Sequence, residues 1–389
     1  MQPPLYDWSP LLSLLFVGVA LAALPLAWVL WRQRSAPATG RLQALTLLTL
    51  FLTFDLVLFG AFTRLTDSGL GCPDWPGCYG HATPLGAHAP IASAQLASPD
   101  GPVTHAKAWI EMVHRYLASS VGFLILVVAL SSWALVWHQR RAKPGRVQAY
   151  PWWATTTLVW VCIQGAFGAL TVTMKLFPAI VSVHLMGGYV LLALLAVLAV
   201  WQSPSLAGRS SGIVPSKLRG ALVLGLLVLI VQVASGAWVS TNYAVLACAE
   251  FPQCQGSWWP QMDFSQGFVL WRPLGLAADG SPLSFQALTA IHFLHRLLAG
   301  LTFIVLISLV WRLYREPALL RPARWLGFLL GLQAVTGLSN VVLDWPLLAA
   351  VLHTGGAGAM GALLAGLLAA TRNPPLAQVL PYSSERPKP

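Results

Sequence analysis

Nine long apolar stretches constrain the fold of this chain more than any other feature of its sequence. They lie at 10–31, 44–63, 109–137, 152–174, 178–201, 218–240, 287–311, 325–343 and 347–371. A helix that crosses a membrane needs about 20 mainly apolar residues, and the chain lacks the alternating pattern typical of membrane barrels. Hydrophobic residues make up 57% of the chain and charged residues 9%, which is more apolar than a soluble core of this length requires. We therefore predict an all-α polytopic membrane protein embedded in the lipid bilayer.

The distribution of basic residues predicts how the chain is oriented in the membrane. Of the 23 lysines and arginines, 17 follow the first, third, fifth, seventh and ninth apolar stretches. They are Arg32, Arg34, Arg41, Arg140, Arg141, Lys143, Arg146, Arg209, Lys217, Arg219, Arg312, Arg315, Arg321, Arg324, Arg372, Arg386 and Lys388. Because cytoplasmic loops carry the excess of Lys and Arg, we expect the amino terminus outside and the carboxyl terminus in the cytoplasm of a bacterial cytoplasmic (inner) membrane. The net charge of +11 therefore indicates topology and no nucleic-acid partner, and the first stretch is interpreted as a retained helix.

This topology places two long loops, at about 64–108 and 241–286, on the outer face. Each loop contains a pair of cysteines with five residues between them, Cys72 with Cys78 and Cys248 with Cys254. An oxidising compartment permits disulfides, so we predict two disulfide bonds. Redox-active thiols and a metal site are the alternatives.

Among the histidines in the apolar stretches, four stand at matching positions of the two halves of the sequence, and an ionisable side chain in such a stretch is costly and indicates a functional site. They are His114, His184, His295 and His353. A histidine on each of two helices can face its partner across the interior of a four-helix bundle, and two axial imidazoles suit a heme. We therefore predict two bis-histidine heme sites. A hydrogen-bonded interior histidine is the alternative at any one position.

The second half of the sequence repeats the first. The separation is 176 residues for Cys72/Cys248 and Cys78/Cys254, 169 for Gln164/Gln333 and His184/His353, and 181 for His114/His295. Such a repeat predicts two duplicated four-helix bundles of the same orientation. We divide the chain into an extra amino-terminal helix with a basic loop (1–43), an amino-terminal unit (44–201), a cytoplasmic linker (202–217), a carboxyl-terminal unit (218–371) and a disordered tail (372–389).

The two sites differ in one residue. Glu111 stands three residues before His114, whereas His292 stands three residues before His295, and residues three apart share a helix face. Glu111 is interpreted as a group that handles protons or stabilises charge beside the macrocycle, with helix capping or pairing with Arg115 as the alternative. For His292 we favour a propionate or hydrogen-bond partner, with replacement of His295 as iron ligand as the alternative.

Neighbouring residues add to the two sites. Arg115 and Arg296 directly follow their histidines and could pair with heme propionates. The glycine pairs 187–188 and 355–356 are predicted to let a flat macrocycle approach the backbone. One site is therefore equipped for chemistry, and the other resembles an electron relay.

Taken together, these residues resemble heme A synthases from about residue 44 to 371. The resemblance rests on the run from Thr63 to Cys78, on Glu111, and on the histidine motifs already named. It implies an oxidoreductase that converts the C8 methyl group of heme O to the formyl group of heme A by successive oxidations, for use in cytochrome oxidase. It also implies a resident heme b on His295 and His353, with Arg296 beside it. Heme O would then bind as substrate at His114 and His184, with Glu111 as the functional carboxylate.

The resemblance extends to the loops and has limits. Cys72 and Cys78 match the family's outer-loop pair, whereas the second cysteine pair occurs in only some members. Arg64, in the matched run, joins Arg115 and His292 as a candidate for contact with a propionate or a loop. Eight spans are usual, so the stretch at 10–31 is a departure.

The expected partners are heme O synthase as substrate donor, cytochrome oxidase assembly factors as acceptors of heme A, and an unidentified electron donor or acceptor. The sequence leaves open a homo-oligomer, the source of oxygen, and whether one imidazole leaves the iron during oxidation. The competing functions are a diheme bis-histidine electron-transfer cytochrome and a heme carrier or assembly protein.

Overall fold

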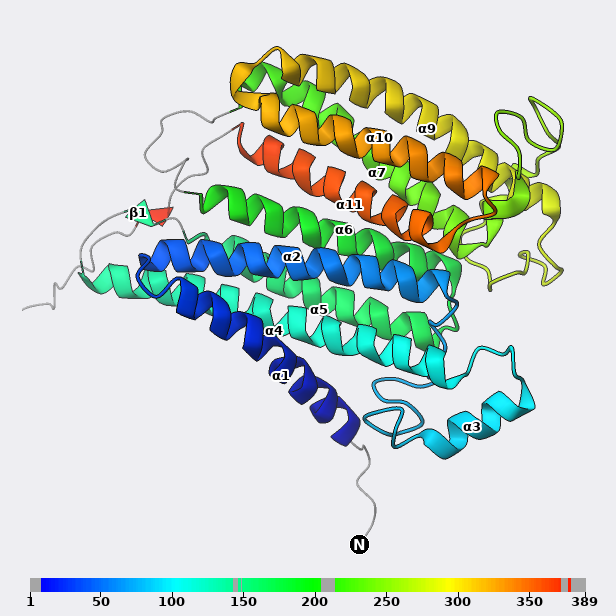
Figure 1. Ribbon diagram of the computed structural model, residues 1–389, viewed down its shortest axis with the longest axis horizontal. Helices are drawn as coiled ribbons and strands as arrows, with labels where there is room; N and C mark the ends of the chain where they lie inside the picture. The colour runs from blue at the N-terminus through cyan, green and yellow to red at the C-terminus, as the bar shows by residue number, and fades with distance from the viewer. Residues whose placement is uncertain (1–7, 143–145, 148, 204–213, 372–376, 379–389) are drawn as a thin grey trace, which may run out of the picture.

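The computed structural model describes residues 8–142, 146–147, 149–203, 214–371 and 377–378. Within these residues, nine helices are long and apolar enough to cross a membrane. They are α1 (Ser9–Arg32), α2 (Ala38–Leu65), α4 (His105–Ala142), α5 (Pro151–Thr173), α6 (Pro178–Trp201), α7 (Arg219–Thr241), α9 (Phe285–Tyr314), α10 (Leu320–Val342) and α11 (Leu347–Ala369). Eight of them lie side by side, and α1 crosses them obliquely (Figure 1). The predicted all-α polytopic membrane protein is confirmed.

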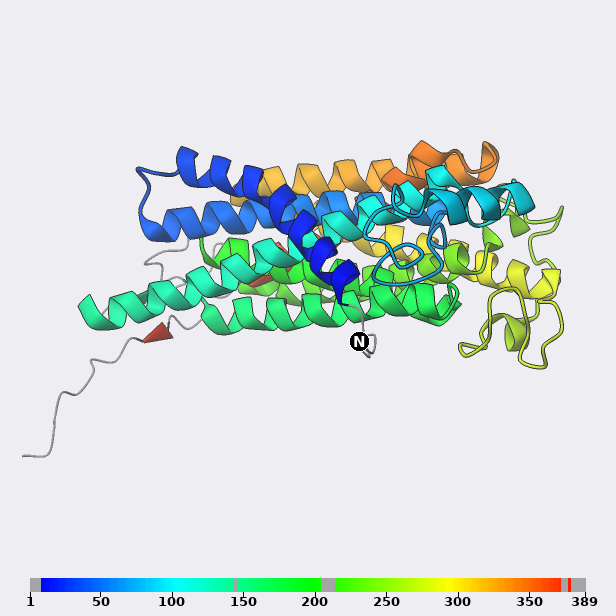
Figure 2. The same cartoon turned by 90° about the horizontal axis from the view of Figure 1, so that it is seen from below.

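The structure also contains short elements that the apolar pattern did not predict. The loop after α2 contains α3 (His88–Ala97), and the loop after α7 contains η3 (Ala244–Ala247) and α8 (Phe264–Gly267). Single turns η2 (Ser216–Leu218) and η4 (Pro317–Leu319) precede α7 and α10, and the strands β1 (Arg146–Val147) and β2 (Ala377–Gln378) form one antiparallel pair. The two long loops both lie at the right-hand end of the bundle in Figures 1 and 2.

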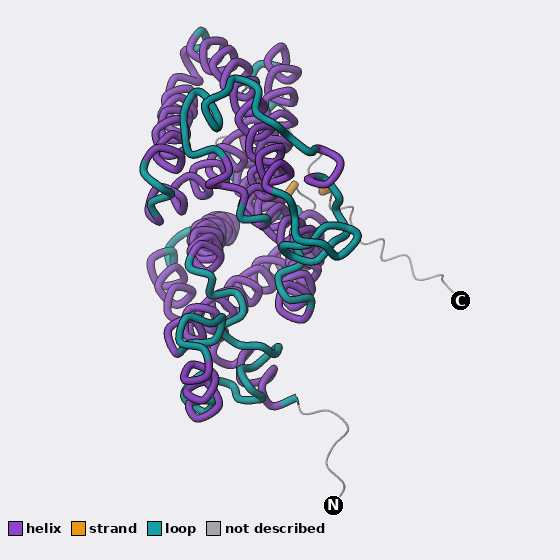
Figure 3. Tube along the Cα trace, turned by 90° about the vertical axis from the view of Figure 1, so that its right-hand side faces the viewer, coloured by secondary structure: helices purple, strands orange, loops and turns teal. Residues whose placement is uncertain are grey.

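The spanning helices form two closed rings. Helices α2, α4, α5 and α6 each contact their neighbours around the first ring, and α7, α9, α10 and α11 do so around the second. Figure 3, which looks along the helices, shows the two groups one above the other. The rings meet where α6 contacts α11, α2 contacts α11, and α7 contacts α6. In the repeat, α2 corresponds to α7 and α6 corresponds to α11. The α2–α11 contact therefore matches the α7–α6 contact, and the α6–α11 contact matches itself, as in a two-fold symmetric interface.

The duplication extends to the backbone of the connections. Lys175 and Leu176, between α5 and α6, have φ values of 51° and 57°. Asp344 and Trp345, 169 residues later between α10 and α11, have φ values of 51° and 61°. Two consecutive residues in this left-handed region are uncommon in non-glycine residues, so the same turn has been kept in both units.

Helix α1 packs on α4 through a close contact between small residues. The Ser120 hydroxyl donates to the Gly18 carbonyl over 2.9 Å, and a Cβ on Gly18 would lie 2.5 Å from the Ser119 Cβ. Large apolar side chains on the other faces of α1 are open to the surroundings, with Leu24 78% exposed and Phe16 74% exposed. Such a surface on a helix of spanning length belongs in lipid.

Some predictions fall on residues outside the described ones. They include 204–213 in the predicted linker and 372–376 and 379–389 in the predicted tail. The division of the chain at 43/44, 201/202, 217/218 and 371/372 stays a prediction.

Candidate functional site

The structure brings the four histidines together in the two predicted pairs. His114 on α4 and His184 on α6 belong to the first ring, and His295 on α9 and His353 on α11 belong to the second. The two histidines of each pair come from opposite helices of one ring, since α4 and α6 both contact α2 and α5, and α9 and α11 both contact α7 and α10. All four histidines are half-buried. Each ring of helices thus holds one facing pair of potential iron ligands.

Each imidazole lies against a glycine on a neighbouring helix. In the first unit, a Cβ added to Gly60 would lie 3.0 Å from the His114 ring, and one added to Gly168 would lie 3.2 Å from the His184 ring. In the second unit, a Cβ added to Gly236 would lie 3.0 Å from the His295 ring, and one added to Gly337 would lie 3.1 Å from the His353 ring. Every one of these glycines stands five residues before the last residue of its helix, α2, α5, α7 or α10. At 1.5 Å per residue the four rings therefore share one depth, roughly 8 Å from the loop-side ends of these helices.

Two glutamines hold the backbone at the histidines of α6 and α11. Gln333 Nε2 donates to the His353 carbonyl over 2.8 Å, and Gln164 makes the matching bond to the His184 carbonyl. A Cβ on Gly356 would lie 2.3 Å from the Gln333 amide. The prediction that the glycine pairs admit a macrocycle is therefore wrong, because Gly356 makes room for Gln333, Gly187 makes room for Gln164, and Gly355 and Gly188 face α2.

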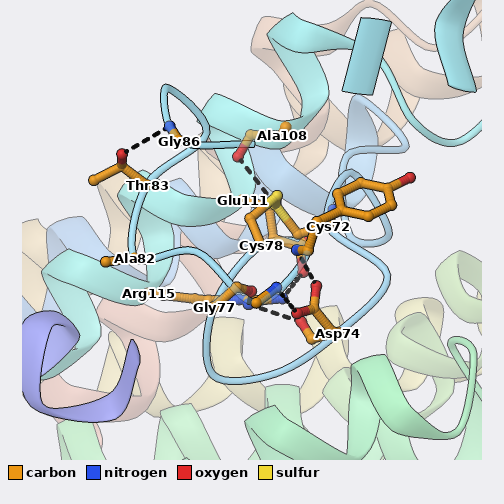
Figure 4. The surroundings of a disulfide bond; sticks show 12 residues. Cys72, Asp74, Gly77, Cys78, Ala82, Thr83, Gly86, Ala108, Glu111 and Arg115 are labelled. Carbon is orange, nitrogen blue, oxygen red and sulfur yellow. Dashed lines mark hydrogen bonds and ion pairs between the residues drawn. A yellow bond between two sulfur atoms is a disulfide. The ribbon is translucent and has the colours of Figure 1, made fainter. Parts of the chain in front are cut away.

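Glu111 fastens the first disulfide loop to α4. Glu111 is buried, with 4% of its surface exposed. Its Oε2 accepts a hydrogen bond from the Cys72 backbone N–H over 2.8 Å, and its Oε1 forms an ion pair with Arg115. Arg115 also donates to the carbonyls of Asp74, over 3.0 Å, and of Gly77. Figure 4 shows these groups gathered around the disulfide. The opposite charges compensate each other's burial, and the carboxylate lies one helical turn from His114.

The second unit repeats this arrangement without the carboxylate. Arg296 donates to the carbonyls of Gln253, over 3.1 Å, and Cys248, and its Nε lies 3.4 Å from His292 Nε2. His292 is buried, with 4% of its surface exposed. The structure therefore places Arg115 and Arg296 alike on loop carbonyls, and contact of either arginine with a propionate stays a prediction.

Both predicted disulfides are confirmed. The Cα atoms of Cys72 and Cys78 are 4.9 Å apart, those of Cys248 and Cys254 are 4.8 Å apart, and all four residues are fully buried. In the described part of the chain no cluster of three or more His, Cys, Asp or Glu side chains could hold a metal ion.

Arg64 lies at the junction of the two units. Its Nη2 donates to the Ser240 carbonyl over 2.5 Å, its Nη1 lies 3.2 Å from Asp67, and its guanidinium lies 4.1 Å from the centre of the Tyr243 ring. The Tyr243 hydroxyl donates to Asp67 over 2.6 Å. Partial burial raises the pKa of this phenol, so it remains a neutral donor near neutral pH.

Sequence reasoning missed two hydroxyls that contact histidines of the second unit. Ser235 Oγ lies 2.8 Å from His295 Nδ1, and Thr336 Oγ1 lies 3.0 Å from His353 Nδ1. The signal was present, because each hydroxyl residue directly precedes the glycine that its histidine contacts, Gly236 or Gly337.

Comparison with known proteins shows the family of this chain. The family model for cytochrome oxidase assembly proteins named COX15-CtaA matches residues 43–365, a range that begins after α1. A heme A synthase of Shewanella oneidensis is 38% identical over 310 residues, covering 80% of this chain and 90% of that protein. A heme A synthase of Alkalihalophilus pseudofirmus is 27% identical over 321 residues, covering 80% and 91%. A protoheme IX farnesyltransferase of Thermus thermophilus is 31% identical over 334 residues, covering 82% of this chain and 46% of that protein. With the matched range spanning both rings and all four histidines, the chain belongs to the COX15-CtaA family of cytochrome oxidase assembly proteins.

Proposed function

We propose that this protein oxidises the C8 methyl group of heme O to the formyl group of heme A in two successive oxidations. The observation that carries the proposal is the difference between two otherwise matching histidine pairs. Among the residues that the structure describes, only the first pair has a buried carboxylate, Glu111, one helical turn from a histidine and bonded to the disulfide loop. The 38% identity to a heme A synthase supports the same reaction.

The residues present fit two hemes. Each pair of imidazoles comes from facing helices, and a glycine stands where a side chain would press on each ring. We assign His295 and His353 to a resident heme b, which supplies a one-electron carrier when bound. His114 and His184 bind the substrate, because Glu111 belongs to their unit.

The chain's own groups control the surroundings of the reacting methyl group. Conversion of a methyl to a formyl group is a four-electron oxidation. With water as the source of oxygen, R–CH3 + H2O gives R–CHO + 4 H+ + 4 e−, so that protons leave the site and electrons pass to the unidentified electron acceptor. Glu111 is the group of this chain that we assign to proton handling or charge stabilisation. The Cys72 amide and Arg115 fix the orientation of its carboxylate, so a movement of the disulfide loop would also move this group.

We propose that the disulfide loops face the outside of the bacterial cytoplasmic membrane and that the carboxyl terminus is cytoplasmic. The basic clusters follow α1, α4, α6, α9 and α11 in the sequence, and the last turns of these helices lie at the opposite end of the bundle from both loops. Alkaline phosphatase fused within residues 64–108 should be active, and the same enzyme fused after residue 389 should be inactive. The reverse pattern would contradict the orientation.

We propose heme O synthase as the substrate donor and oxidase assembly factors as acceptors of the product. The match to a protoheme IX farnesyltransferase supports a donor from the same heme pathway. The family to which the chain belongs supports the acceptors.

The decisive experiment is identification of the product. Cells that make heme O synthase together with this protein should contain heme A on extraction and chromatography, and cells with heme O synthase alone should not. A His184→Ala variant should lose heme A and keep the low-spin heme b spectrum. Wild-type protein that binds two hemes and yields no heme A would reject the proposal in favour of an electron-transfer cytochrome.

A further inference from the structure

The two histidine pairs differ at the Nδ1 side of their rings. In the second unit each ring meets a hydroxyl, Ser235 at 2.8 Å from His295 and Thr336 at 3.0 Å from His353. These residues come from α7 and α10, which adjoin the helices of the histidines. Each ligand is thus held by a neighbouring helix.

The hydroxyl protons decide the tautomer. The Thr336 hydroxyl donates to the Leu332 carbonyl over 2.7 Å, and the Ser235 hydroxyl donates to the Gln232 carbonyl over 2.8 Å. A hydroxyl has one proton, so once that proton is engaged its oxygen can only accept from the imidazole. Each Nδ1 therefore carries the ring proton, and each Nε2 keeps the lone pair that iron requires.

Gln232 does not select a tautomer of His295, because its amide has a second acceptor. Its Nε2 lies 3.2 Å from His295 Nδ1 and 3.4 Å from His295 Nε2. The same amide also lies 3.4 Å from the His295 carbonyl, which accepts its proton whatever the tautomer. When His295 Nδ1 carries a proton and donates it to Ser235, Nδ1 is no longer an acceptor. The Gln232 amide then donates its proton to the His295 carbonyl.

The first unit has phenylalanine at both matching positions. Phe59 precedes Gly60 as Ser235 precedes Gly236, and Phe167 precedes Gly168 in the same way as Thr336 precedes Gly337. Phe59 stacks on His114 with ring centres 6.4 Å apart and an angle of 9° between the planes. His184 Nδ1 is buried and has no hydrogen-bond partner among the described residues. Nothing polar at these two positions fixes the tautomer of either ring.

We propose that Ser235 and Thr336 are positioning residues that make the second unit a retaining heme site, and that Phe59 and Phe167 leave the first unit an exchanging one. A ligating histidine with its second nitrogen hydrogen-bonded binds metal about 10- to 100-fold more tightly than one that has lost this partner. A resident heme needs this retention, whereas a porphyrin that enters as substrate and leaves as product needs ligands that release it. The inference rests on the proposed function in assigning heme b to the second unit.

Thr336→Val tests the inference, because valine keeps the shape of threonine and removes the hydroxyl. Purified holoprotein is mixed with excess apomyoglobin, and transfer of heme b is followed by absorbance. Thr336→Val and Ser235→Ala should each release heme b about 10- to 100-fold faster than wild type. Thr336→Ser, which keeps the hydroxyl, should release it at close to the wild-type rate.

The matched control is Thr302→Val on α9. Thr302 is also buried, and its hydroxyl also donates to a carbonyl one turn earlier, at Leu298 over 2.8 Å. A general folding defect would appear in this variant too. The reduction potential of heme b should rise in Thr336→Val and stay unchanged in Thr302→Val, because loss of the Nδ1–H acceptor makes the imidazole a weaker electron donor.

Wild-type release rates and an unchanged potential in both Thr336→Val and Ser235→Ala would overturn the inference, as would equal effects in Thr302→Val. Heme A is measured separately in the same cells. Absence of heme A with Thr336-dependent retention of heme would reject the proposed function and leave the positioning role intact.

Discussion

Gly337→Ala should loosen the resident heme, because the added methyl group would press on a ligand. The Cβ at this position would lie 3.1 Å from Cε1 and 3.6 Å from Nδ1 of His353. Carbon atoms in favourable contact are about 3.5–4.0 Å apart. The imidazole would therefore have to move by roughly 0.4–0.9 Å, which is near or beyond the tolerance of about 0.5 Å for a working site.

The magnitude follows from what this movement breaks. The ring is held by the 3.0 Å hydrogen bond to Thr336. A ligating histidine that loses this partner binds metal about 10- to 100-fold more weakly. We therefore expect heme b to be bound about 10- to 100-fold more weakly in Gly337→Ala, the same range as for Thr336→Val.

Gly331→Ala is the matched control on the same helix, because a Cβ there would meet nothing within 4 Å. Both substitutions replace glycine by alanine inside α10, so both gain up to about 1 kcal/mol in helix propensity. Heme b per polypeptide is measured after purification, by the pyridine hemochrome spectrum, and release is followed with apomyoglobin. Equal heme content and release rates in the two variants would refute the steric argument.

Three further predictions concern the first unit and α1. Gly168→Ala, whose Cβ would lie 3.2 Å from the His184 ring, should reduce heme A formation because the added methyl group displaces that ring, whereas Gly165→Ala should not, and heme b should persist in both. A double Cys72→Ser, Cys78→Ser variant should lose more heme A than heme b, and equal loss would indicate a general folding defect. Gly18→Ala should displace α1 from α4, because its Cβ would lie 2.9 Å from the Ser119 backbone carbon; reduced cross-linking between engineered cysteines on the two helices would report this, and unchanged cross-linking would contradict it.

The sequence predicted the spanning helices and the histidine pairs because both depend on local information. An apolar run of about 20 residues specifies a membrane helix whatever its neighbours are. The repeat then places each histidine on the corresponding helix of its unit. The paired cysteines have only five residues between them, so their pairing needed no knowledge of the tertiary structure.

The details that the sequence left open depend on which helices meet and in what register. Glycine serves equally well for close approach of a cofactor and for admitting a side chain, and only the position of Gln333 showed which applies at Gly356. Arg115 could have paired with a propionate or with a carbonyl, and the fold of the disulfide loop, which has no periodic pattern, decided its partners here. The hydroxyls of Ser235 and Thr336 became informative once α7 and α10 were seen beside the histidines.

A double-variant cycle would separate the two roles that the structure allows for Glu111. The carboxylate anchors the loop through Arg115 and the Cys72 amide, and it lies one turn from His114. Glu111→Gln keeps the size and an acceptor for the amide, but it leaves Arg115 buried without its charge partner. Breaking a buried ion pair from one side costs about 3–5 kcal/mol, whereas replacing both partners is far less costly.

If Glu111 handles protons, Glu111→Gln should lower heme A formation by about 10²- to 10⁴-fold. The double variant Glu111→Gln, Arg115→Gln has no unpaired charge, but the carbonyls of Asp74 and Gly77 lose the Arg115 donor. Added thiol should therefore reduce its Cys72–Cys78 disulfide more slowly than in Glu111→Gln and faster than in wild type. The double variant should remain as deficient in heme A as the single variant, while heme b stays bound in all three proteins. Recovery of heme A in the double variant would instead assign Glu111 to anchoring alone, since the neutral pair would have partly restored the loop and not the carboxylate.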